Sequence, residues 1–314
     1  MSKIFCRKFS PVLLAGLAVA TLPMFAQDIP MEGPLPTTAL VMVQSKNQVP
    51  LDPASLKLKV DGRETPITAV APIPPAVEQI AILIDDGLRF SFSNQLSEFA
   101  DFINALPQGA QVMVGYMRNG IVLGNQGFST DHAAVAKQLR MPIAMAGVDG
   151  SPYFTLSNFV KNWPSNQRGA RFVLLITNGI DPYNGSYSIM NQDSPYVQTA
   201  QEDAQRAGVA VYSIYYGQSW PRRARGSFSG QSYLKQVAEA TGADSFYIGT
   251  ITPPSLMPYL KEFRQSIDQS YMLSFKVSAP RIKNDTLMQI KLSTNQPGVK
   301  IHTPNGVHPG VYLQ

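Results

Sequence analysis

The sequence predicts an α/β domain with a doubly wound, mainly parallel β-sheet, inserted in a small β module that both chain ends form. In the middle of the chain, apolar runs of strand length alternate with amphipathic helical segments, which is typical of a parallel sheet buried on both faces. Before and after this region, short strands follow one another with no helix between them. We therefore divide the chain into residues 1–26, 27–77, 78–268 and 269–314.

Residues 1–26 have the layout of a secretory signal peptide. Three basic residues precede a short apolar run over 11–24, and Ala26 offers a small residue before the expected cut. The run is shorter than the about 20 residues that a membrane-spanning helix needs, so a retained anchor is the less favoured alternative. We expect a secreted or periplasmic protein, of bacterial type, with no membrane span after cleavage.

The charge and the metal-ligand content exclude several classes of function. Cleavage would remove three of the 26 basic residues and none of the 21 acidic ones, so the net charge of +5 gives little support to nucleic-acid binding. One cysteine, Cys6, and three histidines exclude zinc ribbons, iron–sulfur clusters and a disulfide framework. The sequence has no nucleophile elbow, phosphate loop or dinucleotide fingerprint, and we expect no enzymatic activity.

The two ends of the chain are predicted to share one β module. Residues 27–36 are proline-rich and are interpreted as a leader, and 71–77 as a stiff linker. Alternating or β-branched runs predict strands at the N-terminal end over 38–44 and 56–60, and at the C-terminal end over 271–277, 287–292 and 299–302. We expect the strands of 269–314 to pair with those of 37–70.

The α/β region is expected to begin with a strand over 79–84. Further strands are predicted over 112–117, 120–123, 172–177, 209–216 and 245–248. Helices are predicted over 92–106, 133–139, 154–163, 196–207, 233–241 and 256–267. In such sheets ligands bind beyond the carboxyl ends of the strands, which points to the loops 85–91, 147–152, 178–195 and 217–230.

The residues in these loops resemble the von Willebrand factor type A family. In that family a strand ending in Asp-x-Ser-x-Ser, a threonine from a distant loop and a strand ending in Thr-Asp-Gly hold a divalent cation, the metal-ion-dependent adhesion site (MIDAS). Ile-Leu-Ile-Asp-Asp-Gly over 82–87 is similar to the first strand, Asp-Gly-Ser over 149–151 to the threonine loop, and Leu-Leu-Ile-Thr-Asn-Gly-Ile-Asp over 174–181 to the later strand. Residues 208–217 and 233–242 resemble the family's last β–α–β unit.

The flanking strands resemble the acidobacterial VWFA-related family. The similar segments are 49–51, 58–63, 67–70, 271–275 and 299–303, so the likeness extends over about 37–308. The resemblance implies a Rossmann-like fold with this order of elements, but little about function, because the biochemical role of that family is largely undefined.

The sequence departs from the family's metal-binding pattern. Asp85 keeps the first ligand position, but Gly87 and Arg89 stand where the family has serines. Ser151 is aligned with the threonine, and Asn178 stands in place of the aspartate. Magnesium prefers hard, charged oxygen ligands, and an arginine adds a repelling charge. We expect a degenerate site without a cofactor; the alternative is weak Mg²⁺ binding through Asp85 and Ser151.

Two hypotheses remain for Arg89 and two for the basic segment after residue 216. Arg89 either pairs with Asp85 near the vacant metal position or points to solvent. Arg222, Arg223 and Arg225 either attract an acidic partner or form a solvated loop. Asp86 is expected on the opposite side of the strand from Asp85.

We expect an exported, non-enzymatic interaction protein that binds a protein or a cell-envelope component, with an acidic partner favoured. The alternatives are a metal-dependent adhesion domain and, least favoured, a hydrolase of unrecognised chemistry. The candidate ligand-binding residues are Asp85, Asp86, Gly87, Arg89, Ser151, Asn178, Asp181, Arg222, Arg223 and Arg225.

Overall fold

The computed structural model describes residues 33–45, 50–124, 127–144, 150–184, 192–217, 224–246, 252–278, 283 and 285–313. The predicted signal peptide, residues 1–26, lies outside the described residues. In the part of the chain that is described, no helix has the length and apolar character needed to cross a bilayer.

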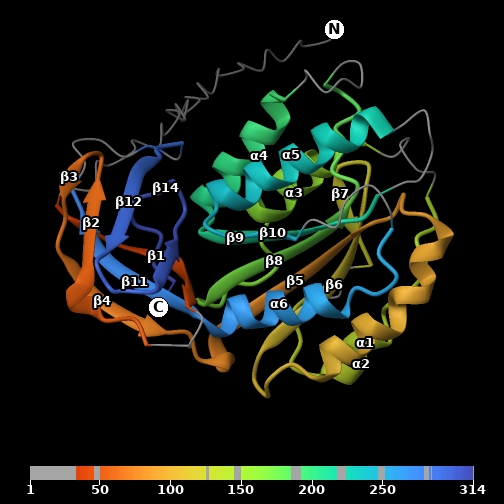
Figure 1. Ribbon diagram of the computed structural model, residues 1–314, viewed down its shortest axis with the longest axis horizontal. Helices are drawn as coiled ribbons and strands as arrows, with labels where there is room; N and C mark the ends of the chain where they lie inside the picture. Colours follow the sequence, from red (N-terminus) through yellow and green to blue (C-terminus); the bar gives the residue numbers. More distant parts are fainter. Residues whose placement is uncertain are drawn as a thin grey trace, which may run out of the picture. The chain divides into compact units, whose positions relative to one another are not determined.

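A six-stranded sheet forms the centre of the α/β region, with the strand order β10-β9-β8-β5-β6-β7 (Figure 1). Its strands are β5 (Glu78–Asp85), β6 (Gln111–Arg118), β7 (Ile121–Leu123), β8 (Ala170–Thr177), β9 (Val209–Tyr215) and β10 (Ser245–Phe246). All neighbours are parallel except the β6–β7 hairpin. The chain moves from β5 to one side, then returns to build the other side from β8. This order confirms the predicted doubly wound, mainly parallel α/β fold.

Helices cover both faces of this sheet because alternate strand residues point to opposite sides. Ile80, Ile82 and Ile84 face a core that includes residues of α1, α2 and α6, whereas Ala81 and Leu83 face α3, α4 and α5. The helices are α1 (Leu96–Asn104), α2 (His132–Ala136), α3 (Pro152–Lys161), α4 (Pro195–Arg206), α5 (Ala224–Ala240) and α6 (Met257–Asp268). Both α3 and α4 begin with a serine cap followed by proline, a sequence well suited to a helix start.

Three sequence-based boundaries need correction. The helix predicted over 92–106 begins as a 3₁₀ helix, η3 (Phe90–Gln95), and only then becomes α1. The loop predicted over 217–230 is helical from Ala224, because α5 starts nine residues before the predicted 233. The predicted leader 27–36 overlaps the first strand, β1, which begins at Leu35.

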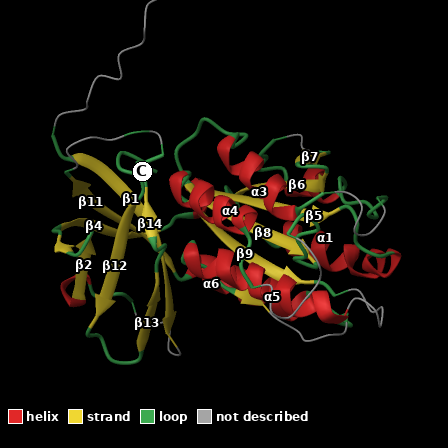
Figure 2. Ribbon diagram, turned by 90° about the horizontal axis from the view of Figure 1, so that it is seen from above, coloured by secondary structure: helices red, strands yellow, loops and turns green. Residues whose placement is uncertain are grey.

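Strands from both chain ends build the β module, as predicted (Figure 2). One sheet has the order β13-β1-β11-β4 and the other β14-β12-β2-β3. The strands are β1 (Leu35–Ser45), β2 (Leu56–Val60), β3 (Arg63–Glu64), β4 (Ile67–Pro72), β11 (Ser270–Val277), β12 (Met288–Thr294), β13 (Val299–His302) and β14 (Gly306–Val307). A short 3₁₀ helix, η1 (Pro53–Ser55), precedes β2, and η2 (Pro75–Val77) leads from β4 into β5. The two sheets share an apolar core to which both ends contribute.

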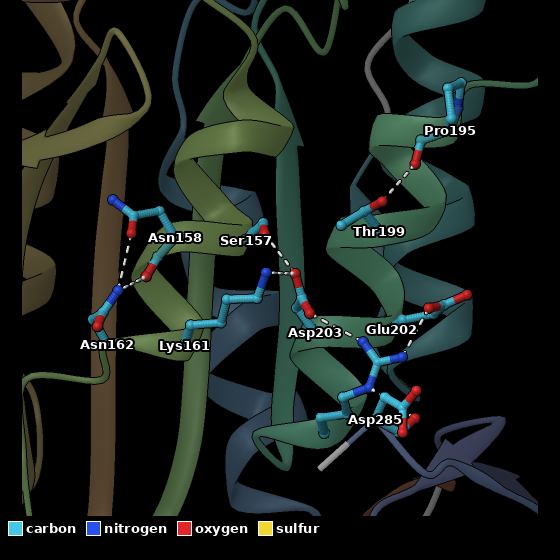
Figure 3. A network of polar contacts seen from close by, with 10 residues as sticks. Ser157, Asn158, Lys161, Asn162, Pro195, Thr199, Glu202, Asp203 and Asp285 are labelled. Carbon is cyan, nitrogen blue, oxygen red and sulfur yellow. Dashed lines mark hydrogen bonds and ion pairs between the residues drawn. The ribbon is translucent and has the colours of Figure 1, made fainter. Parts of the chain in front are cut away.

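Figure 3 shows an ionic network that ties α3 to α4. Asp203 of α4 is 4% exposed, and its carboxylate accepts a hydrogen bond from Ser157 of α3. Lys161 Nζ of α3 lies 2.8 Å from the same carboxylate, and Arg206 Nη1 lies 3.0 Å from it. Arg206 Nε also donates to the backbone carbonyl of Asp285. The two helices are therefore held side by side through a fully paired buried charge.

A second buried ion pair ties the start of β5 to α6. Glu78 is 1% exposed, and both carboxylate oxygens accept from the Arg264 guanidinium, at 2.7 and 2.9 Å. This bidentate geometry is the strong form of an arginine–carboxylate contact. Because Arg264 also contacts Asp268 on its own helix, the guanidinium is held from two sides.

We predict that Glu78→Ala lowers the free energy of unfolding by about 3–5 kcal/mol, because it leaves the largely buried Arg264 guanidinium without its bidentate partner. Urea denaturation measures the change. Glu239→Ala is the matched control, since Glu239 forms an exposed pair with Lys235 at 3.6 Å. We expect the control to cost about 0.5 kcal/mol or less. Equal losses in the two variants would contradict the prediction.

Candidate functional site

The centre of the candidate site is a hydrogen bond between neighbouring strand ends. Ile84 of β5 pairs with Ile176 of β8, so the next residues, Asp85 and Thr177, meet at the carboxyl edge of the sheet. Thr177 Oγ1 donates to Asp85 Oδ2 at 2.6 Å, and the Gly87 backbone N–H donates to Asp85 Oδ1 at 2.9 Å. The two sides of the sheet diverge between β5 and β8, which is where ligands bind in open α/β sheets.

Thr177 is a site residue that the sequence analysis missed, because the family pattern directed attention to Asn178. Strand alternation could have identified it. Residues two apart on a strand point to the same face of the sheet. Leu175 and Leu83 both face the α3–α5 side, so Thr177 and Asp85, two residues further along their strands, are expected on that side as well. Asn178 instead accepts a hydrogen bond from Ile180 N at 2.9 Å through its Oδ1 atom, which orders the following turn.

Asp86 contacts different residues from Asp85, in agreement with the opposite side-chain direction that strand alternation predicts. Its buried carboxylate forms a 2.7 Å ion pair with Arg140 and accepts from Ile143 N at 3.1 Å. The Arg140 guanidinium stacks on the Tyr116 ring, 3.7 Å from its centre. Burial raises the pKa of Tyr116 above its usual value of 10, and Asp86 adds to the rise. Asp86 therefore anchors the segment 140–144.

Two other predicted ligand residues support the loops at this edge. Ser151 is almost fully buried, and its Oγ accepts from Tyr153 N at 3.3 Å as the cap of α3. Asp181 is also buried, and its two oxygens accept from Tyr183 N and Ser194 Oγ. Their side chains are thus engaged within the protein.

Helix α5 approaches the segment after β8 at two glycines. A Cβ atom at Gly230 would lie 2.3 Å from the carbonyl oxygen of Asn178, and one at Gly179 would lie 2.3 Å from the carbonyl oxygen of Gly230. Gly179 also has φ +65°, which other residues rarely adopt. The Tyr153 hydroxyl donates to the carbonyl of Gly179 at 2.7 Å. Burial, with Asp181 nearby, raises the pKa of Tyr153 well above 10, so this donor keeps its proton.

The described donor groups are a poor fit to Mg²⁺. Asp85 supplies a carboxylate whose oxygens already accept from Thr177 and Gly87, and Ser151 caps a helix. Within the described ranges, no group of three or more histidine, cysteine, aspartate or glutamate residues is placed to hold a metal. Six hard oxygen ligands are the usual requirement of Mg²⁺. The metal-free site remains a prediction, since Asp149 lies outside the described residues.

The predicted ion pair between Arg89 and Asp85 is not present among the contacts of the described residues. Arg89 is half-buried, and its Nη2 atom is buried without a hydrogen-bond partner. Arg222 and Arg223 lie outside the described residues. Arg225 belongs to the first turn of α5 rather than to a loop.

The carboxyl edge also carries the exposed large apolar side chains of the described chain. Phe90 follows β5 and is 74% exposed, and Tyr183 follows β8 and is 56% exposed. Ile143, beside Asp86, and Phe228, near the start of α5, are also exposed. We call the full set the apolar rim: Phe90, Ile121, Met141, Ile143, Phe154, Tyr183 and Phe228. Exposed apolar residues that lie together mark interaction surfaces, and within this set Phe154 and Tyr183 are in ring contact. This rim could not be predicted from the sequence, because the exposure of a side chain depends on tertiary packing.

Solved structures similar to this chain share little sequence with it. The von Willebrand factor type A structure from Catenulispora acidiphila has 12% identity and a TM-score of 0.41, over 88% of this chain and 75% of that one. The aerotolerance-related membrane protein from Bacteroides fragilis NCTC 9343 has 10% identity and a TM-score of 0.43, over 61% and 98%. The pilus adhesin SpaC from Lactobacillus rhamnosus GG has 9% identity and a TM-score of 0.46, over 82% and 48%.

No protein-family model matches the chain, and no curated protein sequence does. At these identities, and at TM-scores below 0.5, the solved structures share a loose likeness in fold with this chain. The strand order of the structure itself establishes the doubly wound α/β architecture. Membership of the von Willebrand type A family, and of its acidobacterial branch, stays a prediction.

Proposed function

We propose that this chain is an exported, non-enzymatic interaction protein that binds its ligand through the carboxyl edge of the α/β sheet. The observation that carries the proposal is the apolar rim, because its exposed side chains belong to segments in or beside the connections that follow the strands, the side on which open α/β sheets bind ligands. The ligand is a protein or another component of the cell envelope. Its export rests on the signal-like residues 1–26.

The proposed partner carries an acidic group where it contacts the carboxyl edge of the sheet. The Arg89 Nη2 atom is buried with no hydrogen-bond partner, and a buried donor left without an acceptor is costly. A carboxylate from the partner would satisfy it after a small rotation of the side chain. The arginines at 222, 223 and 225 add positive charge to another segment, 217–230, that the sequence predicts at this edge.

The binding proceeds without a metal in this proposal. Of the carboxylates in the von Willebrand type A metal-binding pattern, this sequence retains only Asp85. Its carboxylate already accepts a hydrogen bond from Thr177. The partner's acid therefore meets an arginine directly, where the von Willebrand type A pattern places a bridging cation. The alternative is an adhesion domain that retains weak Mg²⁺ binding at Asp85 and Ser151.

We predict that calorimetric titration of the purified protein with MgCl₂ or MnCl₂ gives no saturable heat at millimolar metal. Replacing Arg89 by serine removes the opposing charge, and we expect weak binding to appear in Arg89→Ser. Arg63→Ser, an exposed change on β3, is the control and should behave as wild type. Saturable binding by the wild type would overturn the metal-free site.

We also predict that replacing Phe90 and Phe228 together by serine lowers ligand capture from a cell-envelope extract by about tenfold, since exposed aromatic residues dominate interface energies. Mass spectrometry of the captured material measures the change. Lys57→Ser with Lys291→Ser, two exposed changes on the β module, is the control.

An acidic partner adds a second expectation: capture weakens between 50 and 500 mM salt and in Arg89→Gln. Equal capture by the rim variant and the control variant would contradict the proposed surface. Salt-independent capture would contradict the acidic partner alone.

A further inference from the structure

Three aromatic rings from three elements gather at one end of the apolar rim. Phe154 lies in the first turn of α3, Tyr183 follows β8, and Tyr196 lies in the first turn of α4. The ring centres are 4.4 Å apart for Phe154 and Tyr196, 5.5 Å for Phe154 and Tyr183, and 6.5 Å for Tyr183 and Tyr196. The planes are inclined by 55–72°, so the rings present their faces at different angles. We call these three residues the aromatic cluster.

The cluster is open to solvent although its members touch. Phe154 is 38% exposed and Tyr183 is 56% exposed. Leaving aromatic surface in water forfeits the favourable free energy of burying it. Tyr196 packs against the core on the α3–α5 side of the sheet, whereas Phe154 and Tyr183 keep ring surface that a bound group could cover.

Polar contacts join the helices that present the rings. The Asp203 network joins α3 and α4 near their C-terminal ends, away from the rings (Figure 3). Tyr196 follows Ser194, the N-cap of α4, and the Ser194 Oγ donates to buried Asp181. Tyr183 is held through the hydrogen bond from its N–H to Asp181. The cluster is thus preorganised, which lowers the entropy cost of binding.

An acidic residue, Asp193, lies near the cluster along the chain and through one backbone contact. Asp193 is exposed and stands three residues before Tyr196, and its backbone carbonyl accepts from Asn184 Nδ2, next to Tyr183. Burial raises the pKa of the neighbouring Tyr233, and the charges of Asp181 and Asp193 add to that rise. Aromatic faces carry partial negative charge, so rings and carboxylates here attract the same kind of group.

We propose that the aromatic cluster binds a basic side chain, arginine or lysine, of the protein partner. The cation lies against the ring faces by cation–π attraction, and Asp193 supplies the opposite charge. The inference rests on the proposed interaction function and deepens it: the partner carries a basic anchor for this cluster in addition to the acidic group that meets Arg89. An apolar anchor would gain from the rings but nothing from Asp193.

The test compares N-acetyl-arginine methylamide with N-acetyl-citrulline methylamide, which has almost the same shape and no charge. Amide NMR shifts of residues 183 and 196 follow each titration, with NaCl holding the ionic strength constant. We expect saturable shifts with arginine and about fivefold weaker binding of citrulline. Equal binding of the two probes, or no saturable shift with either, overturns the proposal.

Variants separate the attraction of the ring face from general apolar contact. Tyr183→Phe keeps an aromatic face and should retain the preference for arginine, whereas Tyr183→Leu should lose it. Asp193→Asn should weaken arginine binding and leave citrulline unchanged, and Asp131→Asn, at the cap of α2, is the matched charge control. Arginine binding that survives in Tyr183→Leu overturns the proposal.

These outcomes are independent of the envelope-capture experiment with Phe90 and Phe228. If that capture fails while arginine binds at the cluster, the proposed function fails and the local chemistry stands. If the capture succeeds and arginine does not bind at the cluster, only the proposed basic anchor is contradicted.

Discussion

The burial of β5 on both faces is the constraint on which the rest of the structure depends. Residues 80–84 are fully buried, and each fully buried aliphatic side chain contributes about 1.5–3 kcal/mol. A strand in this position needs a hydrogen-bonded neighbour on each edge and helices above and below it, which β6, β8 and the two helix layers supply. The sheet is built outward from β5 in two directions, toward β6 and toward β8. Asp85, the last residue of β5, therefore lies where the connecting loops on the two sides separate.

Strongly patterned elements could be predicted from the sequence, and elements set by tertiary packing could not. The apolar runs placed β5 and β8 within two residues of their observed bounds. The early start of α5 was missed because residues 224–232 include two glycines and three serines, which favour helix weakly. That part of the helix packs against Gly179 instead. At the candidate site, the family pattern identified Asp85 but not Thr177, and exposure at the apolar rim has no periodic signal in the sequence.

The polar groups at the carboxyl edge mainly organise the protein itself. Ser151 and Ser194 begin helices, Asp86 holds a loop, and Asp181 links the segment after β8 to α4. A cation site would need several of these oxygens to point at one centre, and each hydrogen bond within the chain makes that less favourable. The edge is thus suited to recognition by exposed rings and charges on a stable frame, in keeping with the low cost of binding to preorganised surfaces.

The pairing of the two chain ends determines how a mechanical load would travel through the molecule. Thr38 on β1 accepts from Leu313 N and donates its own N–H to the carbonyl of Val311, so residues near the two ends of the described chain are directly bonded. β4 and β11, which lead into and out of the inserted domain, are also paired to each other, with Tyr271 opposite Pro72. Tension applied at residues 33 and 313 therefore acts first on the β module.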